Sequence, residues 1–461
     1  MEKDQLKKEL LPRHVQFLAL AGMIGTGIFK GSGDTLGIAG PGVIISYLIG
    51  GFLLLIVMSA LAEMAVVYPN LNVQHLVHKA FGFHFSFVVG WLYWFNWILV
   101  TIVEILAAGS FLQFWFPNVP LWLLSLICGA LIVGINCIQV KFYGEMEFWF
   151  ASIKITALAL FIILGGAVLL GFSDLSPTTP MLHLTGHGGF LPHGISGVLN
   201  ACLIVMFSYG GSELIGVAIS ETKDVEKVLP KVIKGVVWRV VVFYVFPMLI
   251  IAGLIPWNKV SGQESPFVQV IGAIGIPGAA HIMNFILLTA VLSAANSGIF
   301  ATSRTMFALA EKGEAPEILK TTTKSGVPIF AIILNGLFLL IGAFLAYLAP
   351  GKIIGYMMTI PGFTIILVWI SICCAQLKLR PKYTKIPSFK VKLFPIMTII
   401  GIAGLLIIFF GSTFSNGISV GTVVCFSTLA VLIVLSFIKG RPLKKNKGSK
   451  EQELIGPILK N

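Results

Sequence analysis

The stretch LALAGMIGTGIFKGSG, residues 18–33, decides how the rest of the chain is interpreted. Its apolar character is typical of a membrane-spanning segment, yet five of the twelve residues 22–33 are glycine. Glycine is a poor helix former, so we expect no continuous helix there. Non-helical backbone at membrane depth persists only where protein or a water-filled cavity satisfies its polar groups. The stretch therefore predicts a broken helix beside a cavity. The alternative is that the glycines let helices pack closely.

The composition places the whole chain in a membrane. Of its 461 residues, 57% are hydrophobic and 11% are charged, against roughly a quarter charged in soluble domains. The mean hydropathy is +0.94. The apolar stretches are continuous and long, whereas a membrane β-barrel needs short segments of alternating polarity. The composition thus excludes a soluble globule and a β-barrel, and it predicts an all-α polytopic membrane protein.

Twelve apolar stretches are expected to cross the membrane. They are residues 12–31, 41–68, 85–114, 121–140, 148–171, 195–219, 236–256, 279–303, 328–349, 353–377, 393–413 and 418–438. An even number of spans puts both termini on one side. All but four of the 32 Lys and Arg fall on that side, the exceptions being Lys30, Lys154, Lys259 and Lys352. The positive-inside rule then predicts a multi-pass protein of the cell membrane with both termini in the cytoplasm.

The sixth span contains a second glycine break, MFSYGGSE at residues 206–213. The two breaks occupy corresponding positions in two halves of five spans that start on opposite sides of the membrane. Paired interrupted spans of this kind indicate a transporter site at the interface of an inverted repeat. The expected organisation is a cytoplasmic N-terminus 1–11, a first repeat 12–171, an extracellular loop 172–194, a second repeat 195–377, helices 11 and 12 with a preceding basic loop 378–438, and a basic cytoplasmic tail 439–461.

The chemistry of the gap follows from the ends of the broken helices. Amides after Gly25, at the start of a half-helix expected near Ile28, present a positive dipole end that suits a carboxylate. Carbonyls before that break, and those near Phe207 to Tyr209, suit a cation such as an ammonium. A zwitterionic α-amino acid satisfies both ends.

Several stretches together carry a resemblance to a known family. They are GTGIFKGSG at 25–33, GWLYWFNW at 90–97, KFYGEMEFWF at 141–150 and GSELIG at 211–216. The chain resembles bacterial amino acid permeases of the amino acid–polyamine–organocation superfamily, in its amino acid transporter branch, over about residues 12–380. The resemblance implies a leucine-transporter-like five-plus-five inverted repeat with discontinuous helices 1 and 6 and twelve transmembrane helices.

The residues expected to bind substrate lie at the two breaks. They are Ile24, Gly25, Thr26, Gly27, Phe207, Ser208, Tyr209 and Gly210. Phe207 matches the family position of an aromatic gate that closes over substrate, although position alone favours ordinary packing.

Three charged residues are candidates for proton coupling. Lys154 in span five either snorkels to the interface or loads and releases a proton in each cycle. The resemblance implies that its ammonium fills the place of a sodium ion in sodium-coupled relatives. Glu213 either stabilises a helix N-terminus or carries protons, and Glu104 either lines the cavity or bonds across helices. Glu63, near the end of span two, is expected to have a structural role.

Other chemistries find no support in the sequence. The histidines His75, His78, His183, His187 and His193 are expected in loops without the partners of a metal site. The six cysteines fall in apolar spans, without the spacing of a disulfide framework or a metal site. There is no Walker phosphate loop and no nucleophile–base constellation, so we expect no cofactor, no metal and no enzyme. No aromatic residues interleave with the basic clusters, so no nucleic acid partner is expected.

The sequence therefore predicts a secondary active permease for uptake of a neutral α-amino acid with a proton, by alternating access. Its expected partners are the amino acid, the proton and the lipid bilayer. An amino acid exchanger on the same scaffold, or a permease for a cationic amino acid, is the near alternative. A channel, whose flux would not saturate, or a membrane-embedded enzyme, which would alter its substrate, is the alternative from another class.

Overall fold

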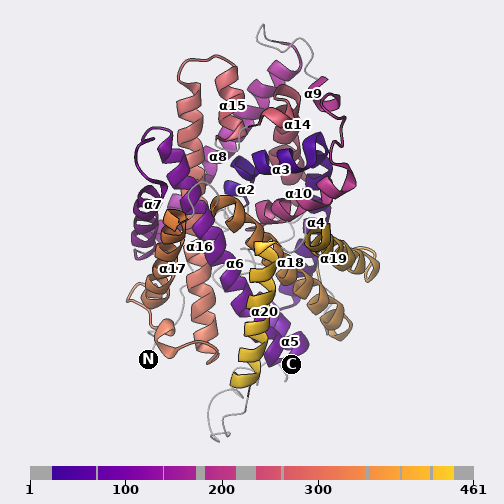
Figure 1. Ribbon diagram of the computed structural model, residues 1–461. Coiled ribbons are helices and arrows are strands. Elements are labelled where there is room, and N and C mark those ends of the chain that lie inside the picture. The colour runs from indigo at the N-terminus through magenta and orange to yellow at the C-terminus, as the bar shows by residue number, and fades with distance from the viewer. Residues whose placement is uncertain are drawn as a thin grey trace, which may run out of the picture.

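The computed structural model describes residues 23–68, 71–138, 140–172, 182–213, 235–260, 264–348, 353–384, 387–415 and 419–440. Within these ranges all regular secondary structure is helical (Figure 1). Eight stretches of the described chain are long and apolar enough to cross a membrane, and three shorter apolar helices accompany them. The prediction of an all-α polytopic membrane protein is confirmed.

Where the chain is described, the long helices overlap the expected spans; residues 12–22 of span one and 214–219 of span six lie outside the described residues. The long helices are α4 (Val43–Val67), α6 (Phe83–Gln113), α7 (Leu121–Asn136), α8 (Val140–Leu169), α10 (Gly194–Tyr209), α16 (Ala279–Glu311), α17 (Ile329–Leu348), α18 (Ile353–Leu379), α19 (Ile396–Ser415) and α20 (Val420–Lys439). Span seven is formed by α13 (Val236–Val240), a π-helical turn η3 (Val241–Val245) and α14 (Phe246–Leu254).

Short helices occupy the breaks and connections. They are α2 (Thr26–Phe29), α3 (Gly31–Ala39), η1 (Gly40–Gly42), α5 (Val73–Phe81), α9 (Leu182–Thr185), η4 (Trp257–Lys259), α15 (Pro266–Ala273), η5 (Glu317–Lys320) and η6 (Arg380–Lys382).

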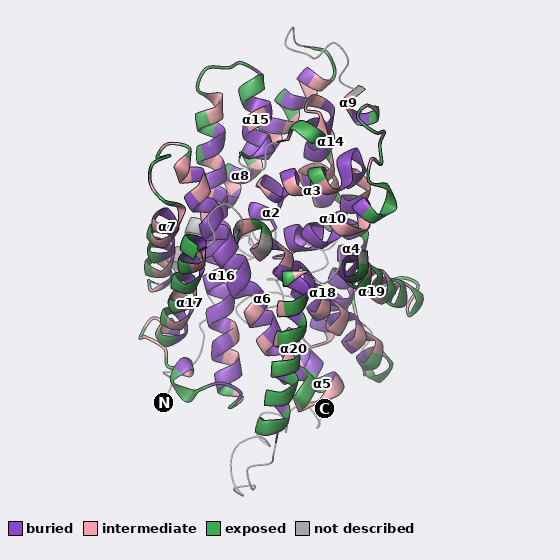
Figure 2. Cartoon of the chain, in the orientation of Figure 1, coloured by how far each residue is buried: buried purple, intermediate pink, exposed green. Residues whose placement is uncertain are grey.

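The core is built around α6 and α16. These two long helices pack against each other, and α16 also contacts α8. Figure 2 shows them largely buried, whereas α19 and α20 present exposed faces at the periphery. Those faces are apolar; Phe414 and Phe437 are 78% and 62% exposed. Apolar side chains on the outside and polar groups inside are the arrangement that a bilayer solvent favours.

The boundary expected between the first two spans, at residues 31–41, is wrong. Helix α3 occupies Gly31–Ala39 and continues through η1 directly into α4. The turn between them needs Gly40, whose φ of 61° lies in the region that glycine adopts readily. The half-helix expected near Ile28 begins earlier, at Thr26.

The expectation of loops is correct for His187 and His193 but wrong for three other histidines. His75 and His78 belong to α5, whose N-cap Asn72 accepts a hydrogen bond from the His75 amide at 3.0 Å, and His183 lies in α9. The sequence hides α5 because its apolar residues form a short amphipathic stripe rather than a span. Among the described residues, no group of three or more His, Cys, Asp or Glu could hold a metal ion.

Candidate functional site

The first helix break is held by a carboxylate from a distant helix. Glu104 of α6 accepts hydrogen bonds from the Thr26 amide at 3.0 Å to each carboxylate oxygen. The Thr26 hydroxyl also donates to Glu104, at 2.7 Å. Glu104 is 3% exposed. The backbone amide that begins α2 therefore binds a carboxylate, as expected for a helix N-terminus.

A cation reaches the same break from another helix. Lys154 of α8 is fully buried, and its Nζ donates to the Ile24 carbonyl at 3.1 Å. Ile24 and Thr26 are two residues apart, so one short unwound segment binds a lysine through a carbonyl and a glutamate through an amide. Lys154 does not snorkel to the surface.

At the second break the carboxylate on the freed amide comes from the same segment. Helix α10 ends at Tyr209, and Gly211 adopts a φ of 106°, which favours glycine. The Gly211 amide donates to the two Glu213 carboxylate oxygens at 3.3 and 3.2 Å. The Ser212 hydroxyl donates to Glu213 at 3.4 Å. Glu213 is fully buried.

The two breaks lie against each other, and Tyr244 joins them. A Cβ added at Gly27 would lie 2.5 Å from the Ser208 Cα, so the backbones approach as closely as glycine allows. The Tyr244 hydroxyl is placed to donate to the Met23 carbonyl and to the Ser208 carbonyl, the latter at 3.0 Å. One hydroxyl with a single proton therefore bridges carbonyls from both breaks.

The remaining predicted residues are buried beside this junction. Phe207 is 4% exposed, and the Tyr209 hydroxyl donates to the Tyr47 carbonyl at 2.7 Å. The Ser208 hydroxyl donates to the Ile204 carbonyl of its own helix, at 2.9 Å. Gly210 caps α10, its amide donating to the Phe207 carbonyl at 3.0 Å. The fold thus brings both predicted segments together.

Sequence reasoning missed Tyr244 and Glu147. Tyr244 sits in the π-helical turn η3, a distortion frequent at functional sites but without a reliable sequence signal. Glu147 of α8 is 3% exposed and accepts a hydrogen bond from the Ser293 hydroxyl at 2.7 Å. It precedes Lys154 by seven residues, two helical turns. This spacing places Glu147 and Lys154 on the same face of α8, and it could have indicated Glu147 from the sequence.

The expected structural role of Glu63 is confirmed. Its Oε2 lies 3.1 Å from a guanidinium nitrogen of Arg380 and accepts a hydrogen bond from the Val391 amide at 2.6 Å. Glu63 therefore fastens the end of α4 to the segment that follows α18, far from the two breaks along the chain.

The comparisons with known proteins agree with this architecture. The family model described as "Amino acid permease" matches residues 14–453. The chain belongs to the amino acid permease family. The permease is 41% identical to the gamma-aminobutyric acid permease of Bacillus subtilis over 410 aligned residues. The aligned region covers 87% of each chain. It is 38% identical over 378 residues to the aromatic amino acid transport protein AroP of Escherichia coli, 82% of each chain.

A third relative extends the similarity over nearly the whole chain. The amino acid permease YvbW of Bacillus subtilis is 40% identical over 443 residues, 95% of this permease and 99% of the relative. The resemblance seen in the sequence is confirmed. The protein is a multi-pass membrane transporter for amino acids and not an enzyme.

Proposed function

We propose that this permease takes up a neutral α-amino acid together with a proton across the cell membrane, by alternating access. The observation that carries the proposal is the first break, where Glu104 binds the Thr26 amide and Lys154 binds the Ile24 carbonyl. A carboxylate and an ammonium already occupy adjacent backbone groups there, so the segment recognises both ends of a zwitterion.

The substrate carboxylate takes the place that the Glu104 carboxylate holds on the Thr26 amide, within the loop Ile24–Gly27. The substrate ammonium takes the place of the Tyr244 hydroxyl between the Met23 and Ser208 carbonyls, and Phe207 closes over the bound molecule. Two carbonyls that share one hydroxyl proton are better satisfied by an ammonium, which has three donors.

Charge balance at the same place supplies the coupling. A substrate carboxylate and the Glu104 carboxylate cannot share one amide while both are charged, because like charges in a buried site repel strongly. A proton on Glu104 removes that repulsion, so substrate binding and proton binding favour each other. Protonated Lys154 binds the Ile24 carbonyl and so takes the place that a sodium ion would otherwise fill. Glu213 passes the coupled proton onward.

The engaged acids support a neutral substrate over a cationic one. Glu104 is bound by Thr26, and Glu213 is bound by Gly211 and Ser212. When Glu104 is protonated with the substrate bound, it carries no charge to balance a cationic side chain, and Lys154 adds a positive charge beside the same break. Two relatives are named for gamma-aminobutyric acid and for aromatic amino acids, which differ in shape, and the uptake screen below identifies the amino acid.

The distribution of charge supports the proposed orientation, with twelve spans and both termini in the cytoplasm. The end of the molecule that carries α5 also carries the C-terminal end of α20 (Figure 1). Exposed lysines lie in α5, at the ends of α18 and α20, and in the connection between η5 and α17: Lys79, Lys378, Lys439 and Lys324. At the opposite end, η4 contributes Lys259. The positive-inside rule assigns the first end to the cytoplasm.

Uptake by proteoliposomes tests the proposal. Initial rates are compared for the twenty amino acids with an inward proton gradient, with a sodium gradient alone, and with a protonophore. We expect saturable accumulation of a neutral amino acid that the protonophore abolishes. Full activity on sodium alone would overturn proton coupling, and uptake only into vesicles preloaded with amino acid would identify an exchanger.

Substrate analogues test the two backbone contacts separately. The amide of the transported amino acid and its decarboxylated amine lack the anionic group, so both should compete poorly for uptake. The N-acetyl derivative keeps the carboxylate and lacks the ammonium, so its competition tests the contact with the Met23 and Ser208 carbonyls. Equal competition by the amine would show that the carboxylate is recognised elsewhere.

A further inference from the structure

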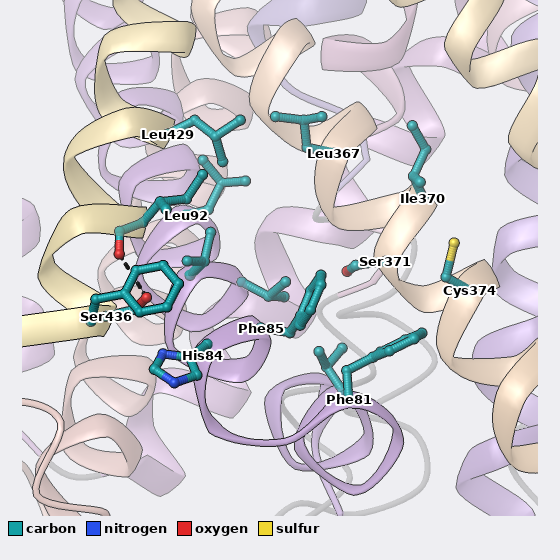
Figure 3. A pocket seen from close by; sticks show the side chains of 15 residues that line it. Phe81, His84, Phe85, Leu92, Leu367, Ile370, Ser371, Cys374, Leu429 and Ser436 are labelled. Carbon is teal, nitrogen blue, oxygen red and sulfur yellow. Dashed lines mark hydrogen bonds between the residues drawn. The ribbon is translucent and has the colours of Figure 1, made fainter. Parts of the chain in front are cut away.

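An apolar groove of about 470 Å³ opens between α6, α18 and α20, away from the two breaks. Fifteen residues line it, and Figure 3 shows Leu429 and Ser436 of α20 facing Ile370 and Cys374 of α18. The volume is within the range of pockets that hold small ligands.

The lining selects hydrocarbon rather than a polar molecule. Two of the few polar side chains in the groove are Ser371 and Ser436, and both donate to their own helix, to Val368 at 2.6 Å and to Ile433 at 2.7 Å. No acidic residue lines the groove. A polar ligand would lose its hydration there without gaining hydrogen bonds, whereas an acyl chain loses nothing.

A basic rim stands at one end of the groove. On α18 the lining residues Leu367, Ile370, Ser371 and Cys374 share one helical face, and the exposed Lys378 continues that face one turn further. The Lys378 ammonium lies 4.6 Å from the centre of the Phe81 ring, which also lines the groove.

Helix α6 adds a second polar group at this end. The His84 ring stacks on Phe437 of α20, with ring centres 4.7 Å apart. Figure 3 places His84 and Phe81 together at the lower edge of the groove. The apolar walls thus meet a rim that carries a cation and an imidazole.

The length of the groove matches one leaflet. From Lys378 to Leu367 is eleven residues, or roughly 16 Å of helix, about half of the roughly 30 Å hydrocarbon core. A membrane-spanning partner helix would need a groove of the full thickness. A lipid of one leaflet, with its headgroup beside Lys378, needs only this half.

We propose that this groove is a binding site for an anionic phospholipid, whose acyl chain lies between α6, α18 and α20 and whose headgroup phosphate binds Lys378. Basic residues beside membrane helices recognise anionic headgroups in this way. The proposal is independent of the transport mechanism, because none of its residues belongs to the two breaks.

Native mass spectrometry of the purified full-length permease tests the site. Dioleoyl phosphatidylglycerol and dioleoyl phosphatidylcholine are titrated separately, and the lipid-bound fraction is measured. We expect phosphatidylglycerol to bind more tightly by about fivefold, the factor for one basic side chain at an anionic surface. Lys378→Gln should remove that preference. The control Lys324→Gln, an exposed lysine at the same end, should keep it.

A second variant tests the acyl-chain contact. Ser371→Phe places a large side chain in the groove. A thermal unfolding temperature close to that of the parent protein shows that the variant is folded. It should bind both lipids less. The proposal is overturned if the two lipids bind equally to the parent protein, if Lys324→Gln acts like Lys378→Gln, if Ser371→Phe retains the lipid, or if a co-purified polypeptide fills the groove.

Discussion

The two helix breaks of this permease have similar sequences and different supports. At the first, the Thr26 amide and the Ile24 carbonyl are bound by Glu104 and Lys154, which come from α6 and α8. At the second, the Gly211 amide is bound by Glu213, two residues further along the same segment. Both breaks use a buried glutamate on a freed amide. Of the two carboxylates, Glu104 comes from a distant helix and Glu213 comes from the segment of the break itself.

The origin of the carboxylate suggests that the two breaks have different roles in transport. A break whose amide is bound by a carboxylate of the same segment keeps that contact when neighbouring helices move. A break whose groups are satisfied by distant side chains can exchange those partners for a ligand, because the partners belong to other helices. We therefore expect variants at the first break to affect binding and coupling, and variants at the second to affect mainly the gate and the onward passage of the proton.

Lys154→Gln should have the largest effect. It removes the charged donor to the Ile24 carbonyl but leaves the Thr26 amide in place, so proton-driven accumulation should fall to simple equilibration. Binding of substrate should change by less than about tenfold, because no substrate contact is lost. Accumulation ratios and binding in detergent measure the two effects. A variant that accumulates substrate like the parent would show that Lys154 is not part of the coupling.

A pair of glutamate variants compares the breaks directly. Glu104→Gln keeps one oxygen that can accept from the Thr26 amide, but it removes the charge that Lys154 faces and can no longer take up or release a proton. We expect initial uptake to fall by about 100-fold, the scale for disrupting a buried charged contact.

Glu213→Gln should cost less, about tenfold, because Ser212 and Gly211 can rearrange within one segment. The pH dependence of uptake should flatten in the Glu104 variant more than in the Glu213 variant. Equal losses in the two variants would remove the distinction between the breaks.

Gly27→Ala tests the crossing point of the two broken helices. The new Cβ would lie 2.5 Å from the Ser208 Cα, a backbone atom that cannot move alone. We expect a loss of about 1–3 kcal/mol in stability and a roughly tenfold loss of uptake. The matched control is Gly37→Ala, where no atom lies within 4 Å of the added Cβ. Thermal unfolding should separate them; similar melting temperatures would contradict the close approach.

Tyr244→Phe should have the smallest effect. It removes the hydroxyl that joins the Met23 and Ser208 carbonyls but keeps the ring. Stability of the substrate-free protein should fall by about 1 kcal/mol, the value of a typical hydrogen bond. If an ammonium replaces the hydroxyl, saturating substrate should restore most of that loss. An unchanged deficit with substrate present would place the ammonium elsewhere.

The sequence by itself determined the solvent of the protein and the positions of its breaks. Continuous apolar stretches are local properties of the chain, and glycine disfavours a helix at Gly25 and at Gly210 wherever the segment lies. Lys154 and Glu104 were recognisable as costly charges in apolar segments. These inferences needed no knowledge of which helices are neighbours. The connection between the first two spans was misjudged because α3 is too polar and too short to be recognised as half of a span.

Only the tertiary structure decided what each break binds. Thr26 and Glu104 are 78 residues apart, and Tyr244 is 221 residues from Met23. Such contacts depend on how α6, α8 and η3 pack around the broken helices, which no periodicity encodes. The two breaks look equivalent in sequence because each is a glycine pair near an acid or a threonine. They differ in the folded protein because only one of them has its own carboxylate within reach, and the other must obtain one from a neighbouring helix.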